Sequence, residues 1–154
     1  QREAEQVRKT AGILDGSTLG KIEIKGKDAL TFVNLMYTNS FTKMKPKTGR
    51  YALMLGEDGM VKDDGIVCKI NDQHFIVTTT TGNAASVLAH MEEYAQTEWP
   101  NLNVYMNSIT EQFATFNLSG PKSRVIMSRV FNDIDFANDR FPFMSFNNFK
   151  YLYT

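Results

Sequence analysis

Two adjacent carboxylates, Asp63 and Asp64, stand where a turn gives way to an apolar run. The stretch reads GEDGMVKDDGIV from Gly56 to Val67. In a strand, neighbouring side chains point to opposite faces, so at most one of the two carboxylates can face a given cavity. A carboxylate aimed into a cleft could accept or orient a proton during a reaction. The alternative is a solvated pair at the start of a strand, and the two residues taken alone favour it.

Four threonines in succession, Thr78–Thr81, form the second polar feature, and Gly82 and Asn83 follow them. One interpretation is a set of hydroxyls that line a polar pocket. The other combines the strand propensity of threonine with a helix cap at Thr81 or Asn83. The threonine run by itself slightly favours this second interpretation.

Other kinds of site lack the residues they need. The single cysteine, Cys68, cannot form an internal disulfide or a cysteine-rich zinc site, and we interpret it as a small buried hydrophobic residue. The two histidines, His74 and His90, have no partners at the spacing of metal ligands or of a catalytic triad. We therefore expect no metal site. The chain also contains no dinucleotide-binding or phosphate-loop glycine motif.

Composition indicates the class of protein. A length of 154 residues suits one domain, and 17 basic residues balance 17 acidic residues. A net charge of zero argues against a nucleic acid or an anionic membrane as a partner held by bulk charge. The chain has no apolar stretch of membrane-spanning length and no signal-peptide pattern at its start. We expect a cytoplasmic protein with no nucleic-acid or membrane partner.

The hydrophobic pattern predicts an α+β fold. Alternating polar and apolar residues indicate strands, and apolar residues three or four apart indicate helices. The Asp58-Gly59 pair predicts a hairpin turn. Consecutive hairpin strands argue against a doubly wound parallel sheet. We expect strands at 21–25, 51–55, 60–70, 75–80, 104–109 and 113–119, and helices at 3–10, from residue 28, at 87–95 and after 121, the last with Val125, Ile126 and Val130 facing inward.

Two segments of the chain follow the same plan. Lys21–Met36 and Thr115–Val130 each read as a strand, a glycine and an amphipathic helix. This similarity predicts duplicated β-α halves, with helices packed on one face of a mostly antiparallel sheet. The aromatic-rich run at 149–154 predicts a further strand that continues into something that covers it. We therefore expect one domain over residues 1–154 that is incomplete at the C-terminus.

An ordered series of motifs extends almost to residue 146. It consists of AGILDGSTLGK (11–21), YTN (37–39), RYALM (50–54), DGMVKDDG (58–65), TTTTGN (78–83), TEWP (97–100), SGPKS (119–123) and FPFM (141–144). The series resembles the aminomethyltransferase-like, folate-binding domain of sarcosine oxidase alpha subunits, which is similar to the glycine cleavage T-protein and dimethylglycine dehydrogenase. The first motif reads DGSTL where T-proteins usually have Asp-Val-Ser-His-Met, so the sarcosine oxidase branch is favoured.

The resemblance implies a site. Asp64 matches the second aspartate of the family's Asp-Asp motif, which positions the folate nitrogens, so it is the expected catalytic residue. Thr80 stands where T-proteins often have a folate-binding asparagine. A glutamate and an arginine of the family's site have no counterpart within these residues, so the implied pocket is incomplete. The expected cofactor-binding residues are Leu19, Tyr51, Asp63, Ile66 and Thr80.

The resemblance also implies a function. The chain would be the tetrahydrofolate-binding segment of a sarcosine oxidase alpha subunit, and it would capture the one-carbon unit from sarcosine as 5,10-methylenetetrahydrofolate. Its partners would be folate and the other subunits or domains of the parent oxidase, where FAD and NAD are expected. Two alternatives stay open: a fragment of a T-protein-type aminomethyltransferase or dimethylglycine dehydrogenase-like demethylase, and a non-catalytic scaffold.

Overall fold

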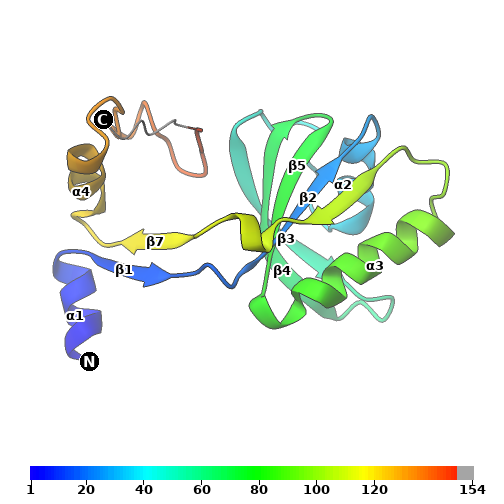
Figure 1. Ribbon diagram of the computed structural model, residues 1–154, viewed down its shortest axis with the longest axis horizontal. Coiled ribbons are helices and arrows are strands. Elements are labelled where there is room, and N and C mark those ends of the chain that lie inside the picture. Colours follow the sequence, from blue (N-terminus) through cyan, green and yellow to red (C-terminus); the bar gives the residue numbers. More distant parts are fainter. Residues whose placement is uncertain (149–154) are drawn as a thin grey trace. The chain divides into compact units, whose positions relative to one another are not determined.

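The computed structural model describes residues 1–148, so the strand expected at 149–154 lies outside the described residues. The described chain forms two compact units (Figure 1). The smaller combines Gln1–Ser17 with Phe113–Phe143, and the larger combines Thr18–Gln112 with the segment from Met144. The expectation of one domain over residues 1–154 stays a prediction.

The larger unit is built on a five-stranded sheet in the order β3-β4-β5-β2-β6, with antiparallel pairing throughout. Two α-helices, each after a strand of this sheet, complete the unit and confirm the predicted α+β class. The hairpin turn falls at Asp58-Gly59, as predicted, and Gly59 has a φ of 76°. The elements are β2 Gly20–Lys25, α2 Ala29–Met36, β3 Thr48–Leu55, β4 Val61–Asn71, β5 His74–Thr79, η1 Thr81–Asn83, α3 Ala84–Thr97, β6 Tyr105–Ser108 and η2 Thr110–Gln112.

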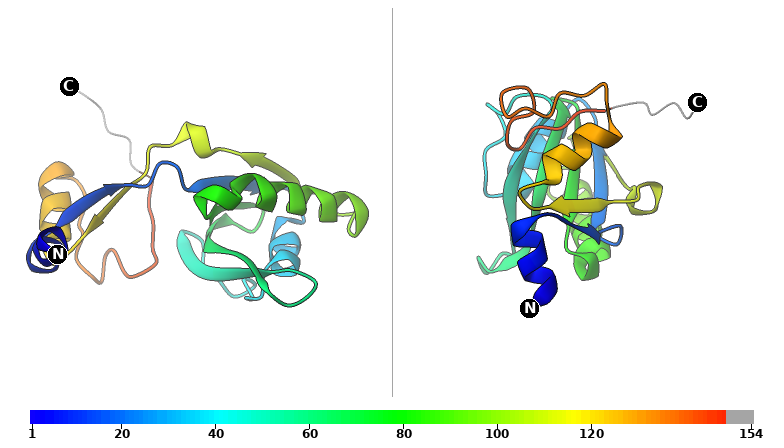
Figure 2. Two further views of the ribbon diagram at one scale, coloured as in Figure 1. Left: turned by 90° about the horizontal axis from the view of Figure 1, so that it is seen from below. Right: turned by 90° about the vertical axis from the view of Figure 1, so that its left-hand side faces the viewer.

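One face of this sheet and the two helices enclose the core. α3 lies against β2 and β6, and α2 lies against β5 (Figure 2). Alternate strand residues face the helices, because side chains along a strand alternate between faces. Tyr51, Asp64 and Ile66 lie on the opposite face of the sheet, away from the two helices, and are therefore not part of the core. The largest fully buried core side chains are Ile22, Ile24, Phe32, Val33, Phe41, Met54, Val67, Phe75, Val77, Val87 and Met91.

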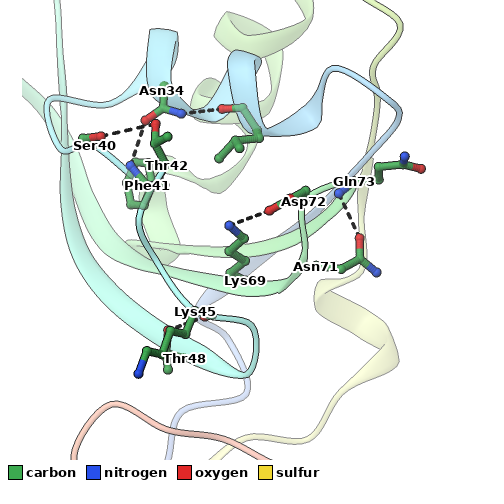
Figure 3. A network of polar contacts seen from close by, with 11 residues as sticks. Asn34, Ser40, Phe41, Thr42, Lys45, Thr48, Lys69, Asn71, Asp72 and Gln73 are labelled. Carbon is green, nitrogen blue, oxygen red and sulfur yellow. Dashed lines mark hydrogen bonds and ion pairs between the residues drawn. The ribbon is translucent and has the colours of Figure 1, made fainter.

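Polar side chains secure the end of the sheet near the β4–β5 turn. Lys69 is a charged residue within a mostly apolar run, yet its side chain is only 3% exposed. Its Nζ lies 2.6 Å from Asp72 Oδ1 (Figure 3). Nearby, Asn34 Nδ2 donates to the Leu30 carbonyl oxygen, and Asn34 Oδ1 accepts a hydrogen bond from the Phe41 N–H, both at 2.8 Å. These contacts fix the loop that follows α2.

The smaller unit consists of short elements: α1 Arg2–Lys9, β1 Gly12–Asp15, β7 Phe116–Ser119 and α4 Ser123–Val130. β1 pairs with β7 in a two-stranded antiparallel sheet. The predicted inward face of α4 is wrong, because Val125, Ile126 and Val130 are 53%, 39% and 50% exposed. So small a unit cannot bury a further apolar face, since the buried fraction of a chain falls with its size.

The strand–glycine–helix plan expected from the sequence is present in both units. Gly26 follows β2 and Gly120 follows β7, with φ values of 139° and 116°. The helix begins three residues after each glycine, and both α2 and α4 have eight residues. This conformation favours glycine, which lacks the Cβ that would clash. A common origin for the two halves stays a prediction.

Candidate functional site

The site begins where the β4–β5 ladder ends. Regular pairing reaches Val67 and Val77. Beyond that point, backbone N–H groups bond to side-chain oxygens of the other segment. The Ile66 N–H donates to Thr78 Oγ1 at 2.8 Å, and the Thr80 N–H donates to Asp63 Oδ2 at 3.1 Å. The two strands are therefore linked by side-chain hydrogen bonds at this end of the sheet.

A small cleft of about 220 Å³ lies at this end of the sheet. Tyr51 and Ile66 are cross-strand partners in β3 and β4, which places both side chains on one face. Leu19 directly precedes β2 and lines the same cleft, and its carbonyl oxygen accepts a hydrogen bond from Lys21 Nζ at 2.7 Å. Five of the six predicted site residues therefore lie together. The lining residues are Leu19, Tyr51, Asp64, Gly65, Ile66, Thr78, Thr79 and Thr80.

Asp63 is the sixth predicted residue, and the structure places it outside the cleft. It pairs across the ladder with the core residue Met54, and it is 6% exposed, whereas Asp64 is exposed. The cause is the alternation of side chains along β4. The predicted contact between Asp63 and a cofactor is thus unsupported by its position. Its carboxylate accepts hydrogen bonds from the Thr80 N–H and from Asn83 Nδ2, at 3.1 and 3.2 Å.

The sequence prediction left three lining residues out of the site: Gly65, Thr78 and Thr79. The pocket interpretation of the threonine run pointed to Thr78, because it shares a face with Thr80 two residues later. The predicted helix cap is wrong, since neither η1 nor α3 has a side-chain cap hydrogen bond. Asn83 occupies the N-cap position of α3, yet its Nδ2 donates to the Lys62 carbonyl oxygen and to Asp63 Oδ1.

The cleft offers a specific mixture of groups. Asp64 supplies acceptor oxygens, Thr78 and Thr80 supply hydroxyls, and Leu19 and Ile66 supply apolar walls. Tyr51 is 63% exposed, so its ring is available for stacking. This combination suits a flat heteroaromatic ring that carries N–H donors.

A larger hollow of about 970 Å³ lies in the smaller unit, between α1 and the β1–β7 pair. It contains none of the predicted site residues. Its ionisable lining residues are Arg2 and Glu3, both exposed near the start of the chain. Chemistry rather than volume therefore identifies the candidate site, and we select the smaller cleft.

The histidines lie outside the cleft. His74 Nε2 is 2.9 Å from Glu23 Oε1, and hydrogen bonding from Lys25, with a smaller contribution from His74, lowers the pKa of Glu23. His90 packs on the Tyr94 ring at 4.4 Å, and burial lowers its pKa. Within residues 1–148 no cluster of three His, Cys, Asp or Glu side chains could hold a metal ion. Over the same residues no helix has the length and apolar character needed to cross a bilayer.

Comparison with known families now bears on this geometry. The family profile described as the GCVT N-terminal domain matches residues 1–154. The chain belongs to the GCVT N-terminal domain family.

Similar proteins include sarcosine oxidase alpha subunits and aminomethyltransferases. The chain is 50% identical over 147 residues to the sarcosine oxidase subunit alpha of Corynebacterium sp. (strain U-96), a match that covers 96% of the chain and 15% of the relative. It is 45% identical over 145 residues to the sarcosine oxidase subunit alpha of Rhizobium meliloti (strain 1021), covering 94% and 15%. It is 31% identical over 150 residues to an aminomethyltransferase of Chlorobium phaeovibrioides, covering 97% and 40%. The resemblance inferred from the motifs is confirmed, and the chain spans 15% of the length of the two oxidase subunits and 40% of the aminomethyltransferase.

A solved structure supports the fold of this family member. The glycine cleavage system aminomethyltransferase T from Bartonella henselae superposes with a TM-score of 0.77 at 21% identity. The match covers 86% of this chain and 36% of that protein. At this level of identity the likeness shows a shared fold.

Proposed function

We propose that this chain is the tetrahydrofolate-binding segment of a sarcosine oxidase alpha subunit. The observation that carries the proposal is the convergence of Leu19, Tyr51, Asp64, Ile66 and Thr80 on one cleft. These residues were selected by motif resemblance, from positions as far apart as 19 and 80. The 50% identity to a sarcosine oxidase subunit alpha supports the same branch of the family.

The size of the cleft limits what it would hold. Small-molecule pockets usually enclose roughly 300–1,000 Å³, whereas this cleft encloses about 220 Å³. The pterin ring system would occupy it, and the remainder of the folate would extend beyond it. The ring would lie between the apolar walls, with its N–H donors toward the carboxylate of Asp64.

When bound, tetrahydrofolate would supply two nitrogens that bond the carbon of the methylene iminium ion left by sarcosine oxidation, giving 5,10-methylenetetrahydrofolate. The bond from that carbon to the glycine nitrogen would break, and glycine, with a neutral amine, and one proton would be released. Asp64 would hold the attacking amine in position and accept that proton, which is a positioning effect with general-base character. Leu19 and Ile66 would keep water from the ring face. The oxidation of sarcosine requires a flavin, which another part of the parent oxidase would supply.

Anaerobic titration of the chain with tetrahydrofolate, followed by calorimetry, tests the proposal. Calorimetry is preferable to tryptophan fluorescence, because Trp99 packs on Phe32 in the core, with ring centroids 5.9 Å apart. We expect Asp64→Asn to weaken binding about 10- to 100-fold, since it removes a charged hydrogen-bond acceptor. The control is Asp58→Asn, whose carboxylate serves only the exposed hairpin turn. Equal affinity for wild type and Asp64→Asn would contradict the assignment.

A T-protein-type aminomethyltransferase is the second candidate. The 31% identity to an aminomethyltransferase over 150 residues and the shared fold favour it. The sequence of the parent gene separates the two candidates, because an upstream dinucleotide-binding domain is expected only for the oxidase. A full parent protein with no calorimetric response to tetrahydrofolate would instead support a non-catalytic scaffold.

A further inference from the structure

We infer that Asp63 and Asn83 form a positioning pair that holds the two walls of the cleft together. The inference rests on the proposed function in one respect, namely that the cleft binds a ligand. Neither residue lines the cleft. Both act through their neighbours in the chain and across the sheet.

Three hydrogen bonds make up this pair. Asp63 Oδ2 accepts from the Thr80 N–H at 3.1 Å, and Asp63 Oδ1 accepts from Asn83 Nδ2 at 3.2 Å. Asn83 Nδ2 also donates to the Lys62 carbonyl oxygen at 3.1 Å. The bonds tie the start of β4 to Thr80, directly after β5, and to Asn83, at the N-cap position of α3.

A carboxylate suits position 63 because two donors converge on it. An ionised carboxylate only accepts, and its two oxygens serve the two donors separately. An asparagine there would turn N–H groups toward one of the donors. The negative charge at Asp63 also reaches the core side of the sheet, where it adds to burial in raising the pKa of Tyr37.

The placement of Asn83 supports a positioning role. A residue at an N-cap position usually accepts a hydrogen bond from the helix backbone. Asn83 makes no such bond, and instead it donates to β4. The Asn83 side chain therefore does not cap α3, and instead it links the start of α3 to β4.

The link lies directly beside the cleft. Asp64, on one wall of the cleft, follows Asp63 in the chain. Thr80, on the other wall, donates its N–H to Asp63, so this hydrogen bond links the two walls. Backbone pairing of β4 with β5 stops at Val67 and Val77. The hydrogen bond from the Ile66 N–H to Thr78 Oγ1 also joins the two walls, through a side chain. Without the pair, Asp64 and Thr80 would be free to separate.

The test compares Asp63→Asn with the control Asp58→Asn in the whole chain. Asp58 also accepts a backbone N–H, from Met60 at 3.0 Å, but it lies in the exposed hairpin turn. Amide resonances and hydrogen exchange are measured in the free protein, and tetrahydrofolate affinity is measured by calorimetry. In Asp63→Asn we expect the Thr80 amide proton to lose its downfield shift and to exchange at least about tenfold faster, as the loss of a charge-assisted hydrogen bond predicts.

The effect must reach the cleft for the inference to hold. We expect shifted amide resonances at Ile66 and Thr78, an unchanged Val77, and tetrahydrofolate binding about tenfold weaker. Asp58→Asn should change none of these. If the Thr80 amide is unaffected, the pair does not exist as described. If the change is confined to Thr80 and affinity is unchanged, Asp63 is structural only.

Failure of the proposed function gives a different result. If wild type does not bind tetrahydrofolate, the assignment of the ligand fails, while the amide resonances of Ile66 and Thr78 still decide whether the pair positions the cleft. If Asp63→Asn does not fold, Asn83→Ala replaces it, because that variant keeps the carboxylate and its bond to Thr80. Asn83→Ala should shift the Ile66 and Thr78 resonances in the same direction by a smaller amount, and unchanged resonances would overturn the inference.

Discussion

Replacement of Gly65 by alanine should force β4 away from β5 at the cleft. A Cβ built on Gly65 would lie 2.0 Å from the Thr78 carbonyl oxygen and 2.8 Å from its carbon. Since a carbon needs about 3.3 Å from a carbonyl oxygen, the backbones must part by more than about 1 Å. The 2.8 Å bond from the Ile66 N–H to Thr78 Oγ1 would then break. Overpacking and the lost hydrogen bond together predict a loss of about 2–4 kcal/mol in the free energy of unfolding.

Two other glycines provide matched controls for Gly65→Ala. Gly82 has nothing within 4 Å of an added Cβ, so Gly82→Ala should change the free energy of unfolding by less than about 1 kcal/mol. Gly59 also has open space, but its φ is 76°, so Gly59→Ala should cost about 1–2 kcal/mol from backbone strain alone. Urea unfolding followed by Trp99 fluorescence measures all three variants. If Gly65→Ala unfolds at the same urea concentration as Gly82→Ala, the close contact with Thr78 does not constrain the strands.

Two further predictions concern buried groups of the larger unit. Burial, and then the charge of Asp63, raise the pKa of Tyr37; the unfolded chain therefore loses this proton first above about pH 10, and stability should fall by up to about 1.4 kcal/mol per pH unit. Tyr37→Phe should flatten the alkaline loss of stability measured by urea unfolding, and equal slopes would contradict this. Asp72→Ala leaves the buried Lys69 ammonium without its carboxylate, and we expect a cost of about 1–2 kcal/mol, reduced because Asp72 is 72% exposed. Lys69→Met should cost less in thermal unfolding, and a larger cost would show that the ion pair itself stabilises the fold.

Much of the larger unit could be predicted from local patterns. Period-two alternation and the Asp58-Gly59 turn predicted the β3–β4–β5 meander, and apolar spacing predicted α2 and α3. The same alternation implied that Asp63 and Asp64 face opposite sides, as they do. The residues that line the cleft could be predicted only from the motif resemblance, because no local pattern connects positions 19, 51, 64, 66 and 80.

Other features depend on contacts that no local pattern encodes. β1 is four residues long and pairs with β7 about a hundred residues later, so it has too few residues to show a period. Lys69 reads as an interruption of an apolar run, and its burial depends on Asp72. Asn83 has the residue type of a helix cap, and its use as a link to β4 follows from tertiary packing.

The contact between Gly65 and Thr78 has a consequence for strand alignment during folding. If β4 slid by one residue in either direction, Asp64 or Ile66 would take the place of Gly65 and would bring a Cβ against the Thr78 carbonyl oxygen. One such slide would also place Lys62 where Asp63 accepts its two hydrogen bonds, and the other would place glycine at the cleft position of Asp64. Gly65, directly after two aspartates, therefore disfavours both shifted registers of β4 against β5. The strands pair closely only in the register that places the second aspartate, Asp64, at the cleft.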